Sequence, residues 1–280
     1  LGIPSFAISF VILGILTSTP ELAVGLTSIA EGQPEIFVGN LLGGIIILFL
    51  LIIPLLAVAG NGIKLDHGLD NYTVLFCLLV ILAPSLLILD KRVTNEEGAL
   101  LVLLYLILLY FVLRKEGFLD RSNTKLLEIK SYSLIDIFKI LGGVALVFIS
   151  SHIIVDKTIS FAEIFRISPF YISLLALSLG TNLPELSIAV RAIALKKKAI
   201  AFGDYLGSAA ANVLLFGMFT LLNIGEVLTV NGFYVMFAFM FSALTLFYFF
   251  SKSKNTLSRG EGLILLGIYA VFVFSEIAKF

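Results

Sequence analysis

Two glutamates in strongly apolar sequence are the residues of this chain that could do chemistry. Glu21 stands in the segment 17–22, TSTPEL, and Glu185 stands in the segment 181–186, TNLPEL. The second segment repeats the first at a shift of 164 residues. A carboxylate at bilayer depth costs roughly 2.5–3.5 kcal/mol even on the lenient insertion scale. Two carboxylates at equivalent positions of a repeat therefore predict the two halves of one ion site.

The composition predicts a membrane protein. Hydrophobic residues make up 59% of the chain and charged residues only 14%, with a mean hydropathy of +1.09. An ordinary soluble domain has about 25% charged residues and is excluded. The net charge of zero gives no indication of a nucleic-acid partner. Cys77 is the single cysteine, so there is no disulfide framework, and no motif indicates a cofactor or a protein partner.

Nine apolar runs are long enough to cross the bilayer, because about 20 helical residues span ~30 Å of hydrocarbon. We therefore expect an all-α polytopic membrane protein. The expected spans are 3–31, 35–60, 71–90, 97–114, 134–155, 167–195, 199–223, 230–250 and 260–279.

The spans divide into two inverted repeats. Glu21 lies in the first span and Glu185 in the sixth, and this odd step makes their helices cross in opposite directions. Inverted-topology repeats form sites near the midplane at the repeat interface. A polar stretch separates the halves, so we expect a first repeat at 1–115, a linker at 116–132 and a second repeat at 133–280.

The two predicted repeats differ by one span. The second repeat has the span 134–155 before its motif helix, whereas the first has none. Symmetry therefore predicts a further helix upstream of Leu1, which makes ten spans of about five per repeat.

Lys and Arg residues give the predicted orientation. Fourteen of the 19 lie on or near the side that holds Leu1, and five lie on the other side. Cytoplasmic loops carry the excess of positive charge. We therefore expect a cell-membrane protein with the Leu1 side and the linker in the cytoplasm and the C-terminus outside.

The prolines before the two glutamates predict broken helices. Pro20 and Pro184 lack a backbone donor and disturb the preceding turn. The breaks are expected near Thr17–Thr19 and Thr181–Leu183, with each glutamate in the first turn of the next half-helix, where the dipole stabilises a carboxylate. For four polar residues, an equally good interpretation is a proline kink whose side chains bond the backbone: Thr17, Ser18, Thr181 and Asn182.

A glycine-containing strip follows each motif. The segment 39–44, GNLLGG, matches 203–208, GDYLGS. Small residues at i and i+4 let helices approach closely, so packing explains the glycines. Four polar residues of these strips could face the site: Asn40, Asp204, Ser208 and Asn212. For Asp204, a role at the site and a buried structural hydrogen bond remain equally open.

The paired T-x-x-P-E segments, each followed by a glycine strip, resemble the alpha repeats of the calcium/cation antiporter superfamily. Its branches are the sodium/calcium and calcium/proton exchangers. The resemblance implies that Glu21 and Glu185 bind Ca²⁺ together, with backbone carbonyls from Thr17 and Thr181. Secondary ion or gating roles are implied for Ser18, Asn182, Asn40, Asp204, Ser208 and Asn212.

The chain departs from both branches. Sodium/calcium exchangers carry a serine at both Gly-Ser positions, whereas the first is Gly44 here. Four residues further on they carry an Asn and an acidic residue, where this chain has Leu48 and Asn212, and Asn182 replaces a serine. The calcium/proton branch usually reads Gly-Asn-Ala-x-Glu at the motif, and this chain does not.

Charge balance favours calcium/proton exchange. Ca²⁺ takes about 6–8 oxygens, and two carboxylates with two carbonyls supply six. Two protons would neutralise the pair as Ca²⁺ does, whereas three Na⁺ would need more polar groups. We therefore expect an antiporter that exports Ca²⁺ or a similar divalent cation against H⁺ by alternating access.

Three other functions are compatible with parts of the sequence. A Na⁺/Ca²⁺ exchanger of the same fold is the first, and a passive cation channel is more distant. An intramembrane aspartyl protease is remote, because Gly203-Asp204 matches part of its motif but position 201 is Ala. The repeat partner of Asp204 is Asn40, so symmetry supplies no aspartate pair, and we expect no enzyme.

Overall fold

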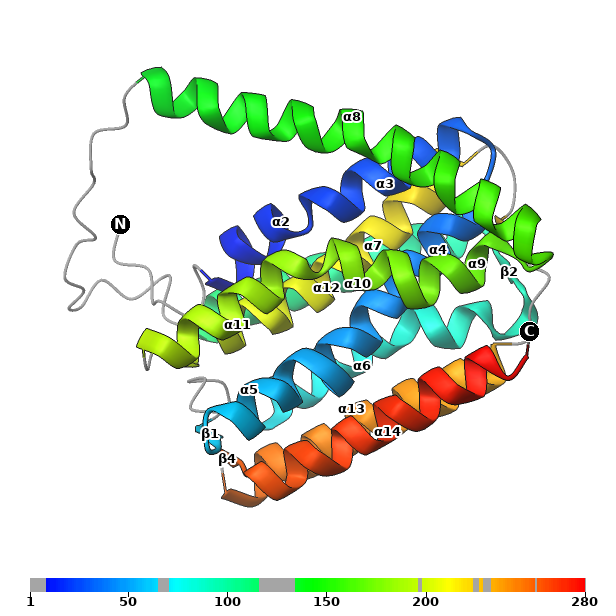
Figure 1. The fold of residues 1–280 in the computed structure, drawn as a ribbon. Helices are drawn as coiled ribbons and strands as arrows, with labels where there is room; N and C mark the ends of the chain where they lie inside the picture. Colours follow the sequence, from blue (N-terminus) through cyan, green and yellow to red (C-terminus); the bar gives the residue numbers. More distant parts are fainter. Residues whose placement is uncertain are drawn as a thin grey trace.

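The protein is a bundle of helices, most of which run along one common direction (Figure 1). The structure is a computed structural model that describes residues 9–64, 71–115, 134–195, 198–223, 227–228, 233–254 and 256–279. Eight segments of this part are long and apolar enough to cross a membrane: 34–59, 72–90, 95–114, 141–165, 169–191, 203–222, 234–252 and 259–277. The expected all-α polytopic membrane protein is confirmed.

The first half of the chain contains the following elements: η1 (Ser9–Leu13), α2 (Gly14–Thr17), α3 (Thr19–Ala30), α4 (Pro34–Ile47), η2 (Leu48–Ile52), α5 (Ile53–Ala59), β1 (Ile63–Lys64), α6 (Asn71–Leu87), η3 (Ile88–Asp90), β2 (Arg92–Val93) and α7 (Asn95–Lys115). The expected first span, 3–31, is thus described from Ser9 onward as η1, α2 and α3.

The second half contains α8 (Leu134–Phe165), α9 (Pro169–Ile172), η4 (Ser173–Leu177), α10 (Ser178–Thr181), α11 (Leu183–Leu195), α12 (Lys198–Leu222), β3 (Val227–Leu228), α13 (Tyr234–Lys254), β4 (Thr256–Leu257) and α14 (Arg259–Ile277). The predicted linker 116–132 and any helix before Leu1 lie outside the described residues.

The end of the span expected at 134–155 is wrong by ten residues. Helix α8 continues to Phe165, although residues 156–165 include Asp156, Lys157 and Glu163. These charged side chains are exposed on a continuing helix rather than placed in a loop. The helix ends just before Arg166, whose φ of 57° is left-handed.

Two short antiparallel strand pairs, which no sequence pattern predicted, follow the same repeat. Strand β1 pairs with β4, and β2 pairs with β3. Adding 164 to the numbers of β1 (63–64) gives β3 (227–228), and adding 164 to β2 (92–93) gives β4 (256–257). The shift therefore relates each strand of the first half to a strand of the second half, and the β1–β4 pair is equivalent to the β2–β3 pair. In Figure 1, β1 and β4 lie at one end of the bundle and β2 lies at the opposite end.

The glycine helix of each half packs against the broken helix of the other half. Helix α4 contacts α9, η4 and α10, while α12 contacts η1 and α2. A Cβ on Gly43 would lie 2.4 Å from the Leu174 carbonyl oxygen, and one on Gly207 would lie 2.0 Å from the Phe10 carbonyl oxygen. These contacts are related by the same shift of 164, so glycine is required at both crossings, and the packing interpretation is confirmed for this pair.

The helix breaks occur where the prolines predict them. Ser18 separates α2 from α3, and Asn182 separates α10 from α11. A π-helical segment precedes each break, at Ser9–Leu13 and Ser173–Leu177, which are again equivalent under the shift. Each interruption is a single residue, because Leu22 N–H still donates to Ser18 O (2.9 Å) and Leu186 N–H to Asn182 O (3.1 Å).

The close packing of α12 against η1 at Gly207 should make the stability of the protein sensitive to any added side chain at this position. Gly207→Ala is expected to destabilise the protein by about 1–3 kcal/mol, because the added methyl group overpacks the crossing of α12 with η1. The control is Gly267→Ala in α14, where no atom lies within 4 Å of an added Cβ and where alanine favours the helix. Thermal unfolding in detergent measures both variants, and equal melting temperatures would contradict the tight crossing.

Candidate functional site

The two glutamates occupy equivalent positions on α3 and α11. Each is the third residue of its half-helix, directly after the proline. Both are buried, with 1% of Glu21 and none of Glu185 exposed. The backbone N–H of each glutamate lies within reach of its own carboxyl. The unpaired donors and the positive dipole of a helix N-terminus favour negative charge there, so the sequence places each carboxylate where the local backbone stabilises it.

Each carboxyl is approached by the broken helix of the other half. Asn182 Nδ2 lies 3.5 Å from Glu21 Oε1, and the Thr181 side chain is close enough to favour negative charge on the Glu21 carboxyl. Thr17 lies in the same relation to Glu185. The charges of the two glutamates also act on each other. The structure thus brings the two halves of the predicted site together.

A pair of serines connects the Glu185 carboxyl to the broken helix of the first half. Ser208 Oγ donates to Glu185 Oε1 over 2.8 Å, and it lies 3.5 Å from Ser18 Oγ of the opposite half. Among the described residues, the second oxygen of each glutamate, Oε2, is buried without a hydrogen-bond partner. Each carboxylate therefore has one oxygen held by a donor and one oxygen left for a cation or a proton.

The proline-kink interpretation explains some of the hydrogen bonds that the polar side chains of the motifs form. Thr17 Oγ1 donates to Leu13 O (3.0 Å), Ser18 Oγ to Gly14 O (2.8 Å) and Asn182 Nδ2 to Ser178 O (2.8 Å). These bonds satisfy the backbone of the preceding turn. The contacts to the opposite half come in addition, so a kink alone does not account for the arrangement.

The polar residues of the glycine strips reach the same region. Thr181 Oγ1 donates to Asn40 Oδ1 over 3.1 Å. Asn212 Nδ2 donates to Leu41 O over 3.4 Å. Asn40, Ser208 and Asn212 are thus in contact with the opposite half.

The space beside Gly44 holds two amide groups that sequence reasoning missed. A Cβ at Gly44 would lie 2.9 Å from Asn182 Nδ2 and 2.9 Å from Asn212 Nδ2. Both are N–H₂ groups and donate hydrogen bonds. The Oδ1 atoms of the same two asparagines are buried without a hydrogen-bond partner among the described residues. The available signal was the combination of Gly44 with asparagines at 182 and 212. The other missing oxygen, at Leu48, is replaced by a buried aliphatic side chain that begins η2.

Asp204 lies one turn before Ser208 on α12 and is fully buried. Neither of its carboxyl oxygens has a hydrogen-bond partner within the described part of the chain. The structural hydrogen bond considered for this residue is therefore not formed there.

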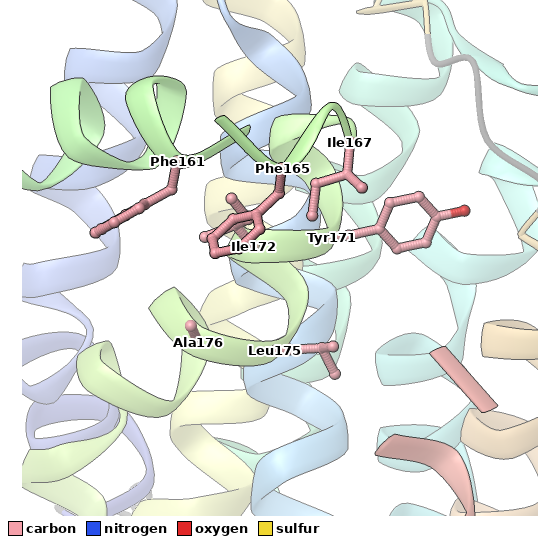
Figure 2. A pocket seen from close by; sticks show the side chains of 7 residues that line it. All are labelled: Phe161, Phe165, Ile167, Tyr171, Ile172, Leu175 and Ala176. Atoms are coloured by element: carbon pink, nitrogen blue, oxygen red, sulfur yellow. The ribbon is translucent and has the colours of Figure 1, made fainter. Parts of the chain in front are cut away.

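The described residues hold no group of three or more His, Cys, Asp or Glu side chains that could bind a metal ion alone. A cation at the glutamates would thus also need hydroxyl, amide or carbonyl oxygens. A separate pocket of about 570 Å³ lies between the end of α8 and the α9–η4 segment (Figure 2). Its lining is apolar and contains no carboxylate: Phe161, Phe165, Ile167, Tyr171, Ile172, Leu175 and Ala176. This pocket is not the ion site.

The family model described as sodium/calcium exchanger protein matches residues 1–114 and 136–278. The chain belongs to the sodium/calcium exchanger family. It is 28% identical over 283 residues to the putative antiporter CaxA of Alkalimonas amylolytica, covering 95% of this chain and 86% of that protein. It is also 28% identical over 235 residues to the inner membrane protein YrbG of Escherichia coli, covering 81% of this chain and 72% of that protein.

The fold of this exchanger is that of a solved relative. The sodium-calcium exchanger NCX_Mj superposes with a TM-score of 0.70 at 21% identity, covering 98% of this chain and 88% of that chain. The protein is a multi-pass membrane antiporter that exchanges Ca²⁺ or a related cation for a monovalent cation, and it is not an enzyme.

Ser208 should set how tightly this exchanger holds its divalent cation. Ser208→Ala removes the hydrogen bond to Glu185 Oε1, and bonds to charged groups contribute roughly 1.5–3 kcal/mol. We expect the Ca²⁺ concentration for half-maximal transport to rise at least about tenfold. The control, Ser187→Ala on α11, removes a hydroxyl that donates only to Leu183 O of its own helix. Equal Ca²⁺ dependence of both variants in vesicle uptake would contradict the role of Ser208.

Proposed function

We propose that this exchanger exports Ca²⁺ in exchange for H⁺ by alternating access, with Glu21 and Glu185 sharing the Ca²⁺. The backbone carbonyls of Thr17 and Thr181 complete the oxygen set in this proposal. No resident cofactor is needed, because Ca²⁺ and H⁺ are the transported substrates.

One observation carries the proposal: each glutamate has a buried oxygen without a hydrogen-bond partner in the described part of the chain, and the two glutamates come from opposite halves. A buried carboxylate without a counter-charge is strongly unfavourable. One Ca²⁺ or two protons would cancel the charge of the pair. The two loaded states are then equal in charge, so neither carries a net charge of the pair into the apolar part of the membrane.

The surroundings of Gly44 support the proton as counter-ion. Na⁺ needs oxygen ligands, but the amide N–H₂ groups of Asn182 and Asn212 fill the space beside Gly44, and Leu48 is aliphatic. A proton needs only the carboxylate oxygen that it joins. The site therefore has the groups for two protons, while the positions of Gly44 and Leu48 contribute no side-chain oxygen to a sodium cage. The unpartnered Oδ1 atoms of Asn182 and Asn212 are the amide oxygens that the described residues leave for a cation.

Charge also explains why transport would be coupled. The empty site would carry two negative charges, and moving them through an apolar barrier costs roughly 2.5–3.5 kcal/mol or more for each charge. Only the neutral states, loaded with Ca²⁺ or with two protons, would cross readily. Exchange is then obligatory without any further device.

The coupling is tested by Ca²⁺ uptake into vesicles with imposed gradients. We expect uptake to follow a pH gradient in sodium-free medium. Glu21→Gln and Glu185→Gln should each reduce it to background, because each removes one charge of the pair. The control is Glu163→Gln, an exposed residue of α8 that should transport like the wild type. If Ca²⁺ moves only when Na⁺ is supplied, the protein is a Na⁺/Ca²⁺ exchanger; uptake without any counter-ion would indicate a channel.

We also propose that the β1–β4 end of the bundle faces the cytoplasm, in keeping with the excess of Lys and Arg on that side. Single cysteines test this in a Cys77→Ala background. Arg259→Cys, next to β4, should react with an impermeant thiol reagent from the cytoplasmic side only. Arg92→Cys, in β2, should react from the outside only. Labelling of both positions from one side would contradict the proposed topology.

A further inference from the structure

Asp204 is a buried carboxyl that the proposed exchange at Glu21 and Glu185 does not use. It is 0% exposed, and both of its oxygens lack a hydrogen-bond partner among the described residues. The hydroxyl of its neighbour Tyr205 is also buried without a described partner. A carboxylate in such surroundings needs a counter-charge or a proton, because leaving it charged and unpaired is strongly unfavourable.

The residue at the equivalent position in the other half, Asn40, has a hydrogen-bond partner. Asn40 accepts a hydrogen bond from Thr181 through Oδ1. The counterpart of Thr181 is Thr17, whose hydroxyl donates to Leu13 O instead of to Asp204. The structural bond of the first half is thus absent in the second half, where the neutral amide is replaced by a carboxyl. At this pair, the departure from symmetry adds a carboxyl group to the second half.

The ionisable surroundings of Asp204 contain no described positive partner. None of the ion pairs in the described part of the chain includes it. The charge of Glu185 acts on Asp204 and opposes a second negative charge. The segments η1 and α2, which pack on α12, contain no titratable residue. The buried titratable side chains on α12 and on the other helices against it are Tyr205, Glu185, Glu21, Tyr105 and Cys77.

Asp204 is also separate from the ion that the two glutamates would share. Glu21, Glu185 and Asp204 do not form a three-carboxylate group that could hold one metal ion. Ca²⁺ at the glutamate pair cancels two charges, so the third carboxylate still requires one positive charge. We propose that Asp204 is a distinct cation position that takes one monovalent cation, H⁺ or Na⁺, whenever the glutamate pair holds Ca²⁺.

The inference rests on the proposed function of the glutamate pair. If it holds, the Ca²⁺-loaded site is neutral only when Asp204 is also occupied. With Asp204 empty, the Ca²⁺-loaded site carries a net negative charge. By the cost of a charge at bilayer depth, crossing should then slow by about a hundredfold. Ca²⁺ transport would thus require a monovalent cation at Asp204. This requirement is separate from the counter-ion that the glutamate pair carries on the return step.

Exchange of ⁴⁵Ca²⁺ for unlabelled Ca²⁺ across vesicles tests this position without any counter-ion. The full chain is reconstituted with equal Ca²⁺ and equal pH on both sides, in choline medium. Wild-type exchange is expected to fall by about a hundredfold at alkaline pH, where neither H⁺ nor Na⁺ is available for Asp204. Recovery on adding Na⁺ at that pH identifies Na⁺ as an occupant, whereas recovery only on acidification identifies the proton.

Variants assign this behaviour to Asp204. Asp204→Asn installs the residue of the equivalent position 40, and it should exchange Ca²⁺ at the same rate in neutral and alkaline medium. Asp204→Glu keeps a carboxyl and should keep the alkaline fall. The matched control is Asp156→Asn, an exposed residue of α8 that should behave like the wild type. If Asp204→Asn does not fold, wild-type exchange that does not depend on Na⁺ or on alkaline pH still overturns the inference.

Three results would overturn the inference. They are wild-type exchange that does not depend on Na⁺ or alkaline pH, an unchanged alkaline fall in Asp204→Asn, and loss of all Ca²⁺ exchange in folded Asp204→Asn. The last result would make Asp204 a Ca²⁺ ligand. Ca²⁺ exchange that persists in Glu185→Gln would instead contradict the proposed function, and it is read independently of the Asp204 variants.

Discussion

The structure depends on one constraint: two buried carboxylates from opposite halves of the chain must always be matched by positive charge. Glu21 and Glu185 are excluded from solvent, and each has one oxygen held by a donor and one without a described partner. In an apolar environment such a pair is tolerated only with a cation or with protons. The same requirement that makes the site costly when empty would couple the movement of one ion to that of another.

The two halves of the chain contribute equivalent residues to the site, and the glycine helix of each half crosses the broken helix of the other half. The shift of 164 residues relates the helix breaks, the π-helical segments before them and the two strand pairs. Gly43 and Gly207 let the backbone of each glycine helix pack directly against the backbone of the broken helix of the other half. The crossing brings Asn182 to Glu21 and Ser18 to Ser208, so that neither half holds a complete site alone.

Much of this could be predicted from the sequence, because the decisive signals are strong and repeated. Long apolar runs, two prolines and two matched glutamates predict the spans, the breaks and the position of each carboxylate in a first turn. The end of α8 could not be predicted, because exposed charges such as Asp156 do not distinguish a loop from a continuing helix. The amides beside Gly44 were missed for another reason: their positions depend on how α4, α10 and α12 meet, and no spacing within one segment specifies that meeting. The assignment of the repeats to residues 1–115 and 133–280, with a linker between them, stays a prediction.

The central claim is that one divalent cation lies between Glu21 and Glu185. A crystal structure of the protein soaked with Sr²⁺, a heavier relative of Ca²⁺ with an anomalous X-ray signal, tests this most directly. The account predicts one strong anomalous peak within the membrane-spanning bundle, coordinated by carboxylate oxygens of both residues. A peak bound by only one of them, or a peak elsewhere in the bundle with none between the two glutamates, would contradict it.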